Sequence, residues 1–153
     1  MKKLAVAIAI VAFVASAHAD PRLIGQWKSD ADLSMKFNRE HAKLEDKTLV
    51  FLEHLFGHLT ITFTAGTVTT SMPNWESQTA LGVNAPMVGF TETHPYKRLG
   101  SSRTEVAVSG REPVTGLRRI TVYNFEGDNT MWVYLGGENF PALHVREYFA
   151  RVR

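Results

Sequence analysis

Short stretches in which apolar and polar residues alternate run through the chain from residue 58 almost to its end. In residues 58–64, HLTITFT, the apolar Leu59, Ile61 and Phe63 alternate with threonines. Such alternation is typical of a β-strand with one buried face, because successive side chains point to opposite sides. Further stretches of this kind lie at 67–72, 87–94, 103–110, 118–125, 130–136 and 145–152, with a weaker one within 75–83. So many strands with short connections predict an antiparallel meander that closes on itself to remove its edges.

Two helices are predicted ahead of this meander, after a first strand-like stretch at 23–28. Apolar residues within 29–57 recur four positions apart, as on one face of a helix. Ser29 and Asp32 resemble a capping box, and Gly57 is a natural stop for a second helix over 46–56. We therefore predict an all-β fold with a small helical insertion. It is a closed antiparallel up-and-down β-barrel of about eight or nine strands, with two helices between the first and second strands.

The first nineteen residues have the pattern of a secretory signal peptide. Lys2 and Lys3 precede an apolar run over 4–15, and the small residues Ala17 and Ala19 form the cleavage site. The alternative, a transmembrane anchor, needs a longer apolar run of about 20 residues. We expect residues 1–19 to be removed and residues 20–153 to form one domain, periplasmic or secreted, with no integral membrane segment after processing.

Charge and cysteine content exclude several classes of function. The chain has 17 basic residues and 15 acids, and removal of Lys2 and Lys3 leaves 15 of each. A neutral mature protein presents no electrostatic attraction for nucleic acid, so no nucleic-acid partner is expected. The chain contains no cysteine, which excludes disulfides, thiol chemistry and cysteine-ligated metals.

Motifs at the two ends of the mature chain resemble those of the calycin superfamily. The first strand carries Gly25 and Trp27 as Gly-x-Trp, and the last carries Arg146, Tyr148 and Arg151. The chain resembles an exported bacterial lipocalin-like domain, and its two predicted helices also resemble those of the fatty-acid-binding proteins. The resemblance implies that Trp27 closes one end of the barrel, with an arginine of the last strand across its ring. Arg146 and Arg151 lie on opposite faces of that strand, and either can be this partner.

A ligand site is suggested by the Arg-x-Tyr of the last strand, which resembles that of the fatty-acid-binding proteins. Arg146 and Tyr148 share one face, so both can reach inward to hold a carboxylate. The resemblance thus implies binding of a small hydrophobic or amphipathic molecule in the barrel, oriented by these two residues. The alternative is a filled barrel that acts as a protein-interaction or inhibitor module.

No set of residues predicts catalysis or a metal site. His54 and His58 have helical i,i+4 spacing, but Gly57 interrupts the helix and no acidic ligand frame accompanies them. Neither a Gly-x-Ser-x-Gly motif nor a phosphate-binding glycine loop is present. We expect a protein that is not an enzyme and that carries no metal and no cofactor.

Overall fold

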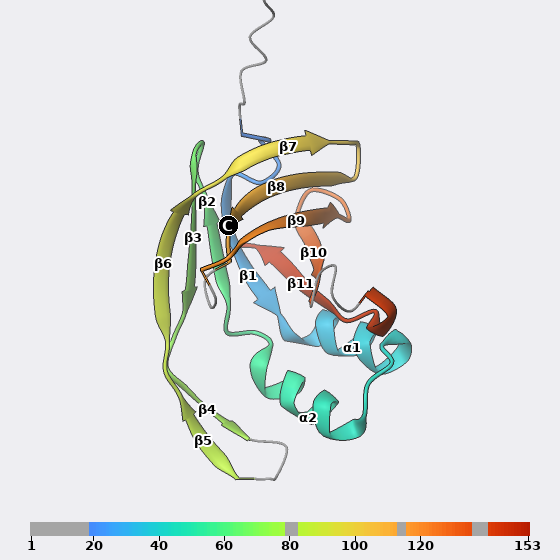
Figure 1. Cartoon of the computed structure of the whole chain (residues 1–153). Coiled ribbons are helices and arrows are strands. Elements are labelled where there is room, and N and C mark those ends of the chain that lie inside the picture. Colours follow the sequence, from blue (N-terminus) through green and yellow to red (C-terminus); the bar gives the residue numbers. More distant parts are fainter. Residues whose placement is uncertain (1–18, 79–82, 113–115, 136–140) are drawn as a thin grey trace, which may run out of the picture.

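The computed structural model describes residues 19–78, 83–112, 116–135 and 141–153, arranged as Figure 1 shows. Residues 1–18 of the predicted leader, 79–82 of the weaker predicted strand and Gly136 lie outside the described residues. Nine strands form one antiparallel sheet, with two helices between the first and second strands. This confirms the predicted fold class.

The sheet follows the chain almost strand by strand. Its strands are β1 (Gly25–Asp30), β2 (Thr60–Phe63), β3 (Thr67–Met72), β6 (Phe90–Pro95), β7 (Lys97–Ser101), β8 (Glu105–Arg111), β9 (Arg118–Phe125), β10 (Thr130–Tyr134) and β11 (Arg146–Arg151). They lie in the order β6-β3-β2-β1-β11-β10-β9-β8-β7. The first strand therefore pairs with the last, as an up-and-down barrel requires.

The two ends of this strand order belong to one continuous stretch of chain. Strand β6 pairs with β3 and β7 pairs with β8, and only Tyr96 separates β6 from β7. The Tyr96 N–H donates to the carbonyl of Gly66 at 3.2 Å. The sheet is thus wrapped into a nearly closed barrel (Figure 1).

Among the strands that pair within the sheet, β9 and β10 share the shortest ladder. The ladder between β9 and β8 runs from Asn124 to Arg118. The ladder between β9 and β10 has only two pairs, Phe125 with Met131 and Asn124 with Trp132. Beyond them β10 continues along β11 and β9 continues along β8, and Figure 1 shows the two strands leaving their shared hairpin in different directions.

Helices α1 (Ala31–His41) and α2 (Asp46–Leu55) cover one end of the barrel (Figure 1). The side chain of Asp30 caps α1 by accepting the Leu33 N–H at 3.0 Å. The predicted cap at Ser29 is wrong, because Ser29 still belongs to β1 and its side chain is buried. Neither helix, nor any other helix of the described residues, is long and apolar enough to cross a membrane.

A separate hairpin of β4 (Trp75–Gln78) and β5 (Asn84–Met87) extends β3 and β6 past α2 (Figure 1). At Gly89, between β5 and β6, the chain passes close to the residues that follow β3, and the Gly89 N–H donates to Asn74 Oδ1 at 2.6 Å. A Cβ at Gly89 would lie 2.4 Å from the Met72 carbonyl oxygen, so only glycine fits there.

Buried apolar side chains form two clusters. The barrel cluster lies inside the sheet and consists of Leu23, Trp27, Ile61, Phe63, Val106, Val108, Tyr123, Phe125, Met131, Val133 and Phe149. The lid cluster lies where the helices meet the barrel and consists of Met35, Leu52, Phe56 and Val145. The helices are therefore packed onto the barrel as a lid rather than exposed beside it.

Candidate functional site

Trp27 and Arg151 stack on each other where the first and last strands pair. Trp27 is fully buried, and its Nε1–H donates to the Leu23 carbonyl at 2.9 Å. The guanidinium carbon of Arg151 lies 4.2 Å from the centre of the Trp27 ring, and the two residues face each other in the β1–β11 ladder. Of the two arginines that the sequence left open, Arg151 is therefore the one that packs on Trp27.

Arg151 also ties three chain segments together. Its guanidinium donates to the carbonyls of Ile24, Arg22 and Asp128 at 2.7, 2.6 and 3.0 Å. Gly25 adopts φ +118, and a Cβ there would lie 3.1 Å from Arg151 Nη1. Because Gly25 has no side chain, the Arg151 guanidinium has room to reach the carbonyls of the residues before β1.

Aromatic rings meet across the inside of the barrel. The ring of Phe63 on β2 lies 5.2 Å from that of Tyr123 on β9, edge to face. Strands β2 and β9 are separated by β1, β11 and β10 in the sheet order, so this contact joins opposite walls. Trp27 and Phe125 make a second edge-to-face contact at 6.0 Å. Side chains therefore occupy the part of the barrel interior where these rings lie.

A buried carboxyl separates the barrel cluster from the lid cluster. Glu147 is 5% exposed, and its Oε1 accepts the Ser29 hydroxyl at 2.6 Å. Ser29 Oγ in turn accepts the Gly57 N–H at 2.9 Å, so the group links β11 and β1 to the segment after α2. Burial raises the pKa of Glu147 to about 7, although the Ser29 hydrogen bond opposes this.

Arg146 and Tyr148 share one face of β11, but it is the outer face. Phe149, next along the strand, belongs to the barrel cluster, so Tyr148 points the other way. Tyr148 packs beside Phe37 of α1 at 6.0 Å and Trp132 of β10 at 6.4 Å. The expectation that this pair reaches into the barrel is wrong, because both residues lie on the outer face of β11, next to Phe37 of α1.

The guanidinium of Arg146 is enclosed by aromatic rings. Its central carbon lies 3.7 Å from the ring centre of Trp132, 4.2 Å from that of Phe37 and 5.2 Å from that of Tyr134. It donates to the hydroxyls of Tyr148 and Tyr134 at 3.4 and 3.2 Å. Within the described ranges it makes no ion pair, and its buried Nε has no hydrogen-bond partner.

Beyond the end of β1, side chains of α1 form hydrogen bonds with the backbone of β11. The Asn38 side chain donates to the Arg146 carbonyl at 2.6 Å and accepts the Arg146 N–H at 2.9 Å. Ser34 Oγ accepts the Tyr148 N–H at 2.8 Å. These two fully buried side chains thus replace the backbone of a neighbouring strand.

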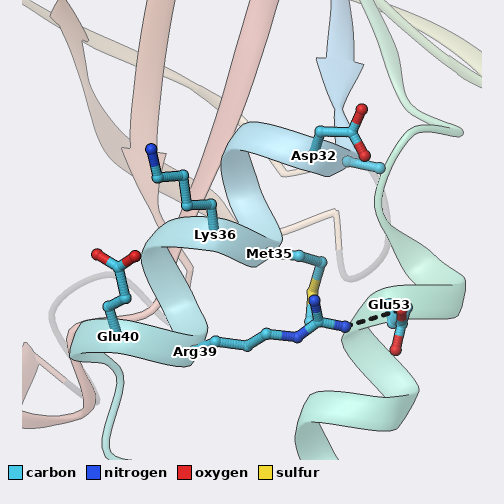
Figure 2. A pocket seen from close by; sticks show the side chains of 7 residues that line it. Asp32, Met35, Lys36, Arg39, Glu40 and Glu53 are labelled. Atoms are coloured by element: carbon cyan, nitrogen blue, oxygen red, sulfur yellow. Dashed lines mark hydrogen bonds and ion pairs between the residues drawn. The ribbon is translucent and has the colours of Figure 1, made fainter.

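A groove of about 540 Å³ lies between α1 and α2. Its lining consists of Ala31, Asp32, Met35, Lys36, Arg39, Glu40 and Glu53. Figure 2 shows Arg39 extending from α1 to Glu53 of α2, with which it forms a 2.8 Å ion pair. Met35 lies beside this pair (Figure 2), and the groove combines an apolar floor with charges of both signs.

The histidines take up separate positions. His58 stacks on Trp75 of β4 at 4.9 Å, and burial together with the charge of Lys28 lowers its pKa. His94 pairs with Glu92 at 3.0 Å. In the part of the chain that the structure describes, no three histidine or acidic side chains are grouped to hold a metal ion.

The fold and these positions define a nearly closed, helix-capped antiparallel β-barrel in which aromatic rings from opposite walls are in contact. Comparison with protein-family models, with curated proteins and with solved structures finds no significant match to this chain.

Proposed function

We propose that the protein is an exported, non-catalytic barrel of the calycin type that binds a partner protein through its outer wall. The supporting observation is the contact between Phe63 and Tyr123, which joins opposite walls. A small-molecule site of ordinary size needs several hundred Å³ of enclosed space. Rings that meet at the centre leave no such space at that level, which favours the outer surface as the binding element.

Apolar side chains exposed on β7 and β9 support this proposal. Leu99 on β7 and Ile120 and Val122 on β9 are all exposed. Exposed apolar groups that gather on one part of a surface are typical of protein contact sites. Neutral net charge after removal of the leader leaves shape and apolar contact as the main source of affinity.

Photo-crosslinking in the exported fraction of producing cells tests the proposal. A benzoylphenylalanine is placed in turn at the exposed apolar positions Leu99 on β7, Ile120 and Val122 on β9, Val50 on α2 and Val88 between β5 and β6. We expect adducts with one protein species from neighbouring positions and none from the rest. Absence of protein adducts at every position, with a small molecule co-purifying with the chain, would refute a protein-binding role.

A second candidate function, binding of a small amphipathic acid, is favoured by the surroundings of Arg146. The described hydrogen-bond partners of its guanidinium are two phenolic hydroxyls, at 3.2 Å or more. A carboxylate is a stronger acceptor for a guanidinium than a phenol. We propose that the head group binds Arg146 and Tyr148 at the outer face, with the apolar part against Trp132 and Phe37.

Titration with dodecanoate tests this second candidate, with dodecanol as the uncharged control. We expect dodecanoate to change Trp132 fluorescence and Arg146→Lys to weaken its binding at least tenfold, since lysine cannot form the two-pronged contact. The matched change Arg118→Lys, at an exposed arginine of β9, should leave binding unchanged. Equal affinity of dodecanoate for wild type and Arg146→Lys would exclude Arg146 as the head-group site.

A further inference from the structure

We infer that the edge of β9 facing β10 is a docking edge, to which an extended acidic segment of a partner protein adds as a strand. This inference rests on the proposed protein-binding function and specifies its site and the chemistry of the partner. The docking edge is the stretch from Arg118 to Tyr123, which lies beyond the two residue pairs that join β9 to β10.

The backbone groups of this edge can be assigned from the ladder on the other side. The Phe125 N–H donates to the Thr104 carbonyl, toward β8. Backbone groups alternate in direction along a strand, so Arg118, Ile120 and Val122 present theirs away from β8. No strand of the described residues pairs with them there, and the Val122 carbonyl instead accepts the Asn124 side-chain amide at 3.2 Å.

The side chains along the docking edge suit an apolar and extended partner. Tyr123 and Phe125 point into the barrel cluster, so Ile120 and Val122 point outward. They are 55% and 41% exposed, respectively. An added strand would place its own alternate side chains beside these two, where cross-strand apolar contacts stabilise the pair.

Positive charge at one end of the docking edge determines where the partner strand carries its acidic residues. Arg118 pairs with Arg111 of β8 in the ladder, and Arg119 lies next to them opposite Gly110. All three arginines are exposed, and none forms an ion pair within the described ranges. Carboxylates of the added strand are therefore expected at the end that meets Arg118.

A second copy of the chain is a poorer occupant than an acidic partner. The residues of β9, RRITVYNF, include no carboxylate. Two β9 edges paired with each other would leave the arginines of both copies without an opposite charge. An acidic segment supplies that charge and the backbone pairing together.

Amide NMR of the ¹⁵N-labelled protein tests this inference with a defined probe. The probe is a hexapeptide blocked at both ends, TVTVEE, whose acids meet Arg118 when it pairs antiparallel to β9. We expect saturable shifts at residues 118–123 and slowed hydrogen exchange at Arg118, Ile120 and Val122, whose N–H groups face away from β8. A control peptide with lysines in place of the glutamates should bind at least tenfold more weakly.

Three variants separate backbone pairing from charge. Ile120→Pro removes an edge N–H that β8 does not use, so it should abolish binding while the spectrum of the barrel core persists. Arg118→Glu should weaken binding at least fivefold, whereas Arg103→Glu, at an exposed arginine before β8, should not. Absence of shifts at 118–123, shifts confined to another element, or a dimer that Ile120→Pro dissolves would each overturn the inference. Crosslinks to a partner protein from another face of the barrel would also overturn this inference, but they would agree with the proposed protein-binding function.

Discussion

The guanidinium of Arg151 lies over the ring of Trp27 at 4.2 Å, and the two residues face each other across the pair formed by the first and last strands. One contact therefore joins the first and last strands of the sheet. The same guanidinium donates to three backbone carbonyls. Arg151 combines stacking with directed hydrogen bonds, as lysine cannot.

Arg151→Lys should destabilise the barrel by about 2–3 kcal/mol, because hydrogen bonds from a charged donor contribute about 1.5–3 kcal/mol and the ring contact is lost as well. Urea denaturation measured by Trp fluorescence gives this value. Arg153→Lys, at the exposed last residue, is the matched control and should change stability by less than about 0.5 kcal/mol. Equal midpoints for the two variants would show that Arg151 is dispensable for closure.

Glu147 should make stability depend on pH. An unfolded glutamate ionises near its ordinary pKa of 4.5, whereas burial raises the folded pKa to about 7. Between these values the unfolded chain has released a proton that the folded chain still holds. Stability from this group is therefore complete below pH 4.5 and is lost as pH rises to about 7.

Glu147→Gln removes this titration and keeps an acceptor for the Ser29 hydroxyl. We expect the variant to be more stable than wild type at pH 8, by roughly 3 kcal/mol from the difference in pKa, and equal to it near pH 4. Denaturation midpoints from pH 4 to 8 measure the difference, with Glu76→Gln on the exposed face of β4 as the control. A pH profile of Glu147→Gln parallel to that of wild type would contradict the assignment.

Asn38→Ala should loosen the lid. The substitution leaves both backbone groups of Arg146 without the partners that Asn38 provides at 2.6 and 2.9 Å. Each unsatisfied buried group costs about 1–3 kcal/mol, so a total loss of about 2–4 kcal/mol is expected. Hydrogen exchange should quicken at Arg146 and along α1, whereas Asn84→Ala, at an exposed residue of β5, should leave both rates unchanged.

The first and last strands could be predicted from the sequence because their residues are distinctive. The family resemblance implied that an arginine of the last strand packs on Trp27 but left Arg146 and Arg151 open, and the structure places Arg151 there, beside Gly25. Period-2 alternation also placed Arg146 and Tyr148 on one face of the strand. Alternation alone does not say which face turns inward, and the outward face carries an arginine and a tyrosine that α1 covers.

Glu147 and β7 escaped prediction for related reasons. Glu147 lies between the buried Val145 and Phe149 on the inward face of β11, and its charged side chain interrupts the alternation of apolar and polar residues by which buried positions are recognised. The period-2 spacing of these three residues was the signal that could have singled it out. Strand β7, KRLGS, has a single apolar side chain and an irregular register at Arg98–Gly100, so tertiary pairing with β8 forms it.

We propose that side chains fill the middle of the barrel and that binding takes place on its outside. Methyl NMR of wild type with labelled valines measures this directly, because Val106, Val108 and Val133 belong to the barrel cluster. During titration with dodecanoate up to millimolar concentration, we expect no shift of these three methyl signals. Saturable shifts of the three together, with contacts from them to the alkyl chain, would refute the proposal and place the ligand inside the barrel.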